Sequence, residues 1–210
     1  MAYLAEDYAC FSRDSPAPGI IPTMTKTRIG IFFGGKSAEH EVSIMSAKNV
    51  LQAIDLDRFE PVLIGIDHTG EWHHVDNSQL VSSQEPGVIS TAPVIERFQS
   101  LETLHLDVAM PILHGPMGED GTIQGFFELA NIPYVGPGVL ASAACMDKEY
   151  TKRLLRDAGL LVAPFVVIHK DASYNPTDIF AQVGKVLFVK PANMGSSVGV
   201  SRADSEETLS

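Results

Sequence analysis

Short apolar runs separated by glycines and polar turns fill the first part of the chain. Residues 28–33 (RIGIFF) and 61–66 (PVLIGI) are two such runs, and each predicts a buried strand. Between them apolar residues recur at helical spacing, which predicts a helix over residues 42–54. The order strand, glycine turn, helix, strand is that of a βαβ unit, so we expect an α/β fold with a parallel sheet.

The rest of the chain continues this alternation. The region 77–102 is polar, contains scattered prolines and gives only a weak signal. Asp147 is a plausible N-cap for a helix that stops at Gly159. Further strands are predicted at residues 106–113, 133–136, 163–168, 185–190 and 198–201, a short helix at 122–130, and a helix start at 205–208.

Composition narrows the class of protein. With 210 residues, 45% of them hydrophobic, the chain can form one large core or two small ones. The formal net charge of −11 argues against a general nucleic-acid binder, which needs a basic surface to displace counterions. Cys10 and Cys145 show no pairing pattern, so a reducing cytoplasm is the simpler interpretation.

The chain shows no signal for a membrane or for secretion. No stretch approaches the roughly 18 apolar residues that a membrane-spanning helix needs, so we expect no membrane span. Residues 1–25 carry early acids, lack a continuous apolar segment and include a Pro-Ala-Pro-Gly turn. They are therefore a poor signal peptide, and we interpret them as a poorly ordered leader.

The first candidate for chemistry is the loop GGKSAEHEVS, residues 34–43, at the carboxyl end of the first strand. Ligands of open α/β sheets bind outside the carboxyl ends of the strands. A carboxylate there, from Glu39 or Glu41, would suit a cationic group such as an amino-acid ammonium. The alternative is that both acids simply favour the N-terminus of the helix through its dipole. Spacing alone favours this second interpretation.

The second candidate is the segment LHGPMGEDGTIQG, residues 113–125, where His114 again follows a strand. Its glycines, with Glu119 and Asp120, indicate a shaped loop before a helix. A lone histidine is more often a satisfied structural group, and that interpretation is favoured for His114 on this feature alone. The other histidines, including His40, His73 and His74, lack metal-ligand spacing, and we expect them on the surface or in a loop.

The third candidate is the lysine-first loop KPANMGSSVGVS, residues 190–201. Lys190 would stand at the edge of a pocket, and the amides and hydroxyls of residues 195–199 would wrap phosphate oxygens. A flexible hairpin turn is the alternative. Lys148 would add a second positive charge, or is an ordinary solvated lysine. Together the three loops would suit a nucleotide and a zwitterionic substrate.

Four motifs, residues 34–43, 114–125, 141–159 and 188–201, together resemble the successive motifs of the bacterial D-alanine–D-alanine ligase family. The resemblance runs from about Arg28 to the end. It implies an N-terminal doubly wound, Rossmann-like (pre-ATP-grasp) sheet in a substrate-binding domain, residues 26–140. An ATP-grasp central subdomain would follow, residues 141–210, and would be incomplete. The loop with Lys190 would be the strand-loop-strand that covers the triphosphate.

The implied reaction joins two D-alanines through an acyl phosphate and gives ADP and phosphate, for peptidoglycan precursor synthesis. By resemblance, Glu39 holds the ammonium of the first D-alanine, and His114 lies beside that substrate and its carboxylate. Ser196 helps to fix the loop, in a hydrogen-bond network with Glu39 and a tyrosine that lies further on in the family. These three are the expected catalytic residues, and Glu41 is given a structural role.

The implied ATP contacts are Lys148 and Lys190, on the phosphates, with Gly195, Ser196 and Ser197 in the loop. Mg²⁺ or Mn²⁺ is expected as the cofactor, with its ligands after Ser210, and the family also implies a cytoplasmic homodimer formed through the N-terminal domain. The chain alone is therefore expected not to complete catalysis. Two alternatives are a D-alanine–D-lactate or D-serine ligase, and a non-catalytic dimerisation or amino-acid-binding fragment.

Overall fold

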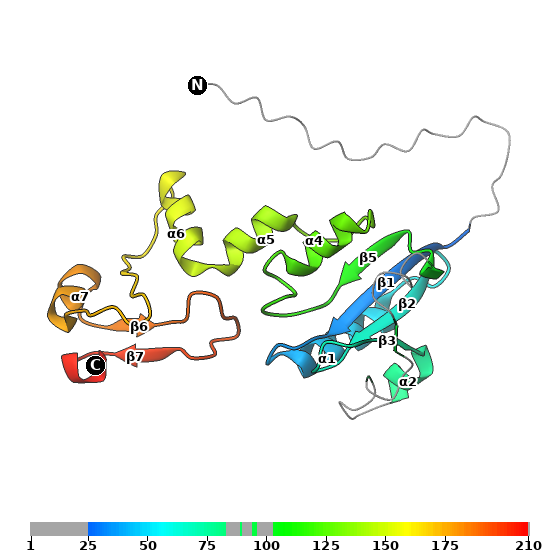
Figure 1. Ribbon diagram of the computed structural model, residues 1–210, viewed down its shortest axis with the longest axis horizontal. Helices are drawn as coiled ribbons and strands as arrows, with labels where there is room; N and C mark the ends of the chain where they lie inside the picture. The colour runs from blue at the N-terminus through cyan, green and yellow to red at the C-terminus, as the bar shows by residue number, and fades with distance from the viewer. Residues whose placement is uncertain (1–24, 83–88, 90–93, 96–102, 210) are drawn as a thin grey trace, which may run out of the picture.

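A five-stranded sheet forms the N-terminal part of the molecule, and a two-stranded sheet lies in the C-terminal part (Figure 1). The computed structural model of the protein describes residues 25–82, 89, 94–95 and 103–209. The larger sheet has the spatial order β4-β3-β2-β1-β5. Its strands are β1 (Thr27–Gly34), β2 (Phe59–Ile66), β3 (Trp72–Val75), β4 (Val94–Ile95) and β5 (Val108–Pro111).

The predicted parallel pairing holds for three of these strands. β1 pairs in parallel with β2 and with β5, whereas β3 runs antiparallel to both β2 and β4. The reason is the tight connection after β2, where one oxygen of Asp67 accepts hydrogen bonds from the amides of Thr69, Gly70 and Glu71. Only antiparallel neighbours can be joined by so short a turn. The sheet is therefore mixed.

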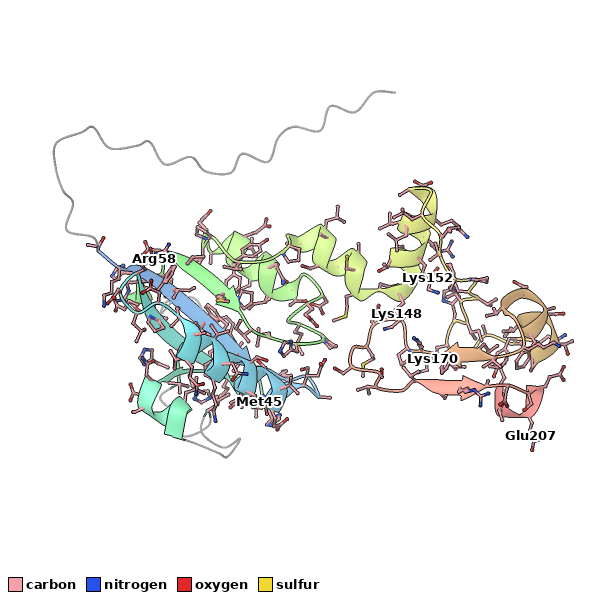
Figure 2. All side chains as sticks on the ribbon, turned by 180° about the vertical axis from the view of Figure 1, so that it is seen from behind. Met45, Arg58, Lys148, Lys152, Lys170 and Glu207 are labelled. Atoms are coloured by element: carbon pink, nitrogen blue, oxygen red, sulfur yellow. The ribbon has the colours of Figure 1, made fainter. Side chains whose placement is uncertain are left out.

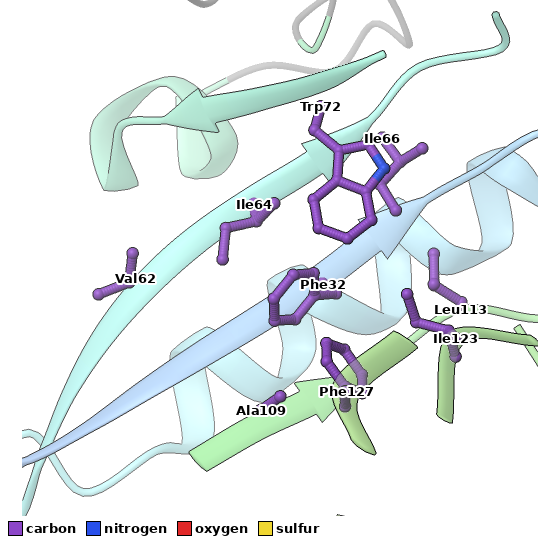
Figure 3. Close-up of a cluster of buried hydrophobic side chains, with 9 residues drawn as sticks. All are labelled: Phe32, Val62, Ile64, Ile66, Trp72, Ala109, Leu113, Ile123 and Phe127. Atoms are coloured by element: carbon purple, nitrogen blue, oxygen red, sulfur yellow. The ribbon is translucent and has the colours of Figure 1, made fainter. Parts of the chain in front are cut away.

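Helices cover both faces of this sheet, as the predicted doubly wound fold requires. α1 (His40–Ala53) and α2 (Asn77–Ser82) pack on one face, and α4 (Thr122–Leu129) packs on the other. Side chains alternate along β1, so Ile31 and Phe33 join the core under α1 while Phe32 faces α4. Figure 3 shows Phe32 between Trp72 and Phe127, with ring centroids 5.4 and 4.8 Å away.

The C-terminal part contains an antiparallel hairpin with its own small core. β6 (Leu187–Val189) pairs with β7 (Ser201–Ala203), and the loop with Lys190 joins them. Ile179, Leu187, Ala203 and Leu209 form the buried cluster. The helices of this part are α5 (Val139–Met146), α6 (Lys148–Asp157), α7 (Pro176–Val183) and α8 (Glu206–Leu209).

Two of the predicted strands are wrong. Residues 163–168 form no strand, and Val166 and Ile168 are 36% and 41% exposed. Residues 133–136 contribute only an isolated bridge from Tyr134 to Ala109. The predicted strand at 198–201 begins only at Ser201, because residues 195–200 form two successive turns.

The placement of His73 also differs from expectation. His73 lies in strand β3 and is 3% exposed, so it is neither a surface nor a loop residue. Its Nε2 lies 3.2 Å from Oδ2 of Asp67. Burial opposes ionisation of Asp67, but hydrogen bonds from Thr69, Glu71 and His73 hold the pKa of its carboxyl well below the usual range. His73 therefore stabilises, from within β3, the turn that reverses the sheet. His40, in α1, is also buried, at 1% exposed, so it too differs from the expectation.

The predictions for the ends of the chain and for membranes have different outcomes. The leader prediction falls almost wholly on residues 1–24, which lie outside the described residues. Within the part of the chain that is described, no helix is both long and apolar enough to span a membrane.

Candidate active site

The first candidate loop leads from β1 into α1 and presents Glu39 at the helix N-terminus. Glu39 occupies the N-cap position, but its side chain makes no capping hydrogen bond. Instead its carboxylate accepts a hydrogen bond from the hydroxyl of Ser196, 157 residues later in the chain. Glu41 points elsewhere, with its Oε1 3.5 Å from Nε2 of His68. The dipole interpretation therefore does not account for where the Glu39 carboxylate lies.

Two glycines leave room for that carboxylate. A Cβ atom added at Gly115 would lie 2.9 Å from Oε2 of Glu39, and one added at Gly195 would lie 3.1 Å from the same oxygen. Gly115 belongs to the second candidate loop and Gly195 to the third. Glu39 is thus the point at which all three predicted loops meet.

The second loop is held in shape by its own acids, as predicted. The amide of Gly115 donates to Glu119, at 2.7 Å, and the amides of Met117 and Thr122 donate to Asp120. Burial opposes ionisation of Asp120, yet these hydrogen bonds outweigh it and lower the pKa of its carboxyl. The half-buried His114 lies at the start of this loop, with Nε2 3.1 Å from the hydroxyl of Ser46.

The third loop adopts a conformation that is uncommon for residues with side chains. Ser196 and Ser197 have φ of 47° and 59°, in the left-handed region. Such a conformation costs about 1–3 kcal/mol per residue, and residues held in it are enriched at functional sites. Turn hydrogen bonds from Val198 to Gly195 and from Val200 to Ser197 support it. The loop is a defined turn rather than a loose hairpin connection.

Lys148 lies against this loop, whereas Lys190 does not share that contact. Asp147 caps α6 as predicted, accepting hydrogen bonds from the two amides after Lys148. The Lys148 ammonium donates to the carbonyl oxygen of Met194 and to that of Ala192, the latter at 3.4 Å (Figure 2). Lys190 is exposed, and its ammonium lies 6.0 Å from the ring centroid of Phe188.

A cavity of about 340 Å³ lies at the carboxyl ends of β1, β2 and β5. Ser37 and His114 line it together with apolar side chains, including those of Trp72 and Leu113. Glu39, Lys148 and Lys190 are not among the residues that line this cavity. The cavity therefore joins the first two loops, while hydrogen bonds through Glu39 and Lys148 bring in the third.

Comparison with models of known protein families shows which family the chain belongs to. A model described as the D-Ala–D-Ala ligase N-terminus matches residues 28–137, just over half of the chain, and one described as the C-terminus matches residues 154–210. The chain belongs to the D-alanine–D-alanine ligase family. D-alanine–D-alanine ligase A from Escherichia coli K12 is 49% identical over an alignment of 202 positions, which covers 88% of this chain and 56% of that protein. The chain thus spans about half the length of the curated relatives it matches.

Solved structures show the same relationship. A D-alanine–D-alanine ligase from Coxiella burnetii has a TM-score of 0.77 at 34% identity, covering 88% of this chain and 58% of that one. The D-Ala:D-Ser ligase VanG from Enterococcus faecalis gives 0.71 at 34%, covering 88% and 57%. A D-alanine–D-alanine ligase from Bacillus anthracis, solved in complex with ATP, gives 0.61 at 30%, covering 87% and 52%.

Two residues of the site escaped sequence reasoning. Ser46 contacts His114 but lies in the middle of a helix, where nothing in the local pattern distinguishes it from a solvated serine. Trp72 lines the cavity from β3, a strand that was not predicted. The one available signal for Ser46 is its spacing of three residues from Ser43, which places both on one face of α1.

Proposed function

We propose that the protein containing this chain joins two D-alanines to D-alanyl-D-alanine with ATP, releasing ADP and phosphate. The observation that carries the proposal is the hydrogen bond between Glu39 and Ser196. It brings a carboxylate at the end of the N-terminal sheet together with the loop whose two serines are in the left-handed conformation, the loop that would cover the phosphates. An amino acid and a triphosphate would then lie side by side, as transfer of a phosphoryl group from one to the other requires.

Glu39 would hold the ammonium of the first D-alanine. The two flanking glycines keep the carboxylate accessible on a short loop, and the hydroxyl of Ser196 fixes one of its oxygens. A charge-assisted hydrogen bond from the ammonium to the other oxygen would then orient the substrate. His114, next to Gly115, would lie beside the carboxylate of this D-alanine.

Lys148 and Lys190 would contact the phosphates of ATP, with Gly195, Ser196 and Ser197 covering them. The Lys148 ammonium already lies against the loop, and Lys190 is free to turn toward a phosphate because its side chain is exposed. Support for ATP also comes from the Bacillus anthracis relative, which was solved with ATP. A magnesium ion would neutralise phosphate charge when bound.

The described residues do not fit a magnesium site next to this loop. Their only group with metal-compatible spacing is Asp67, Glu71 and His73, on the turn after β2. Magnesium prefers oxygen ligands, and both carboxylate oxygens of Asp67 are occupied by the turn and by His73. We therefore assign no metal ligand within the described part of the chain.

The chemistry explains why ATP is needed. A carboxylate is a poor electrophile until one of its oxygens carries phosphate. In the proposed reaction the carboxylate of the first D-alanine attacks the γ-phosphate and displaces ADP. The amine of the second D-alanine then attacks the acyl carbon, loses a proton, and phosphate leaves. The residues of this chain would orient the reactants and shield the acyl phosphate from water.

Replacing Glu39 in the full-length protein tests the proposal. The wild type, given D-alanine, ATP and magnesium, should form D-alanyl-D-alanine and ADP in equal amounts, measured by mass spectrometry and a coupled ADP assay. Glu39→Gln should lower kcat/KM for D-alanine by at least about tenfold, the value of one charge-assisted hydrogen bond. Glu41→Gln, two residues away and directed toward His68, is the matched control and should retain activity. A wild type that forms no dipeptide refutes the proposal.

A second candidate is ligation of D-alanine to D-serine, which the likeness to the Enterococcus faecalis enzyme favours. Competition between D-alanine, D-serine and D-lactate in the same assay distinguishes the products.

We propose in addition that the protein forms a homodimer through residues 26–140 and that it is located in the cytoplasm. Calorimetry of the 210-residue chain with D-alanine and ATP tests the remaining possibility of a non-catalytic fragment, which would bind no ATP.

A further inference from the structure

Helix α1 directs two serines, one turn apart, at the end of strand β5. The buried hydroxyl of Ser43 accepts a hydrogen bond from the amide of Gly34, at 2.8 Å, and donates one to the carbonyl oxygen of Ile112. Ser46 lies 3.1 Å from Nε2 of His114, two residues beyond Ile112. The Ser43 hydroxyl therefore binds backbone groups, whereas the Ser46 hydroxyl contacts the side chain of His114.

His114 needs such a contact if its ring is to keep one orientation. It lies beyond the last residue of β5 and just before Gly115, whose φ is 72°, so His114 itself belongs to no helix or strand. Within the described residues, the bond to Ser46 is the one hydrogen bond found for the imidazole. At the next residue, Gly115, an added Cβ would lie 2.9 Å from Oε2 of Glu39. His114 thus directly precedes a glycine whose backbone lies next to the Glu39 carboxylate.

We propose that Ser46 is a positioning residue that orients His114 toward the first D-alanine. This inference rests on the function proposed above. The hydroxyl engages Nε2 and so fixes the ring orientation, which leaves Nδ1 as the nitrogen available to the substrate. Ser46 itself touches no reactant, so its whole effect on the reaction passes through His114.

A double-mutant cycle in the full-length protein tests whether Ser46 acts through His114. Ser46→Ala should lower kcat and kcat/KM for D-alanine by an equal factor of about fivefold to tenfold, because a misoriented His114 would lose the hydrogen bond that it would make in the transition state. Ser46→Thr keeps a hydroxyl and should recover most of the rate. In a His114→Ala background, adding Ser46→Ala should change nothing further, because the group that it positions is gone.

Ser43→Ala is the matched control, because it removes the neighbouring hydroxyl that holds backbone. It should lower the thermal midpoint, and its effect should be the same with and without His114. The proposal is overturned if Ser46→Ala behaves in this way, if it leaves the rate unchanged, or if Ser46→Thr is as slow as Ser46→Ala.

Nitrogen-15 spectra of the histidine side chains separate this inference from the proposed function. Ser46→Ala should shift the Nε2 signal of His114 and leave the signals of His40 and His73 in place. If the wild type forms no dipeptide, the proposed reaction fails but this spectrum still reports the contact. An unchanged His114 signal in Ser46→Ala then rejects the positioning role.

Discussion

Gly115→Ala should damage the proposed D-alanine site by displacing Glu39. Gly115 has φ of 72°, in the left-handed region, and an added Cβ would lie 2.9 Å from Oε2 of Glu39. Real Cβ atoms essentially never approach a neighbour so closely, so the Glu39 carboxylate must leave its present position. Gly159→Ala is a matched control, because Gly159 has φ of 77° and nothing lies within 4 Å of its added Cβ.

The two variants should lose similar stability. Placing an L-residue in the left-handed region costs about 1–2 kcal/mol, and alanine recovers about 0.4–1 kcal/mol by restricting the unfolded chain. The net loss is about 1 kcal/mol for each, which lowers the thermal midpoint by about 2–4 °C in a protein of this size. Any difference between the two variants in the KM for D-alanine then reflects the displacement of Glu39 rather than general destabilisation.

Steady-state kinetics in the full-length protein, with circular dichroism for thermal unfolding, measure both quantities. Gly115→Ala should raise the KM for the first D-alanine by at least about tenfold, since the ammonium loses a well-placed charged partner. Gly159→Ala should keep the wild-type KM. Equal KM values in the two variants, at equal stability loss, would refute the proposed role of Glu39.

Three further changes test the core, a loop and the phosphate site. Phe127→Ala should lower the free energy of unfolding by about 3–5 kcal/mol because the ring is fully buried. Leu129, on the same helix, is 82% exposed, so Leu129→Ala should change that free energy by less than about 0.5 kcal/mol. Urea unfolding of the two variants measures both values. The pKa of Asp120 is lowered in the folded state, so its stabilisation is present above about pH 4 and is lost as the pH falls through the folded pKa. Asp120→Asn should therefore be less stable than the wild type at neutral pH and approach it in acid, as thermal unfolding across pH would show; a constant difference would contradict this. Lys148→Ala should weaken ATP binding by about tenfold in calorimetry, whereas Lys152→Ala, one turn along α6, should not; equal losses would argue against a specific phosphate contact.

The sequence predicted the elements whose pattern is set by burial. β1 and β2 are continuous apolar runs because both of their faces are covered, and α1 shows helical spacing because only one of its faces is. β3 escaped because His73 and His74 interrupt its apolar pattern. His73 is nevertheless buried, since it pairs with the turn residue Asp67. α5 escaped because its residues are small or apolar all round, which leaves no helical period.

Local pattern misled where the outcome depends on distant partners. Residues 163–168 have the composition of a strand, but a strand needs a neighbour, and none pairs with them in the described structure. Glu39 is the same case within the site. Its local setting at a helix N-terminus favoured a structural role, whereas its actual partner, Ser196, lies 157 residues away. Only the family resemblance pointed to that contact. The expected domain boundary at residue 140 stays a prediction.

The bond from Lys148 to the loop has a thermodynamic consequence. An ammonium has three donors, and here Met194 and Ala192 take two of them. The third donor is left for a phosphate oxygen, so a triphosphate could bind the same nitrogen while the turn stays attached to α6. Part of the nucleotide site would then be ordered before ATP arrives, and a variant that lost the two carbonyl contacts would bind ATP more weakly because binding would also have to order the loop.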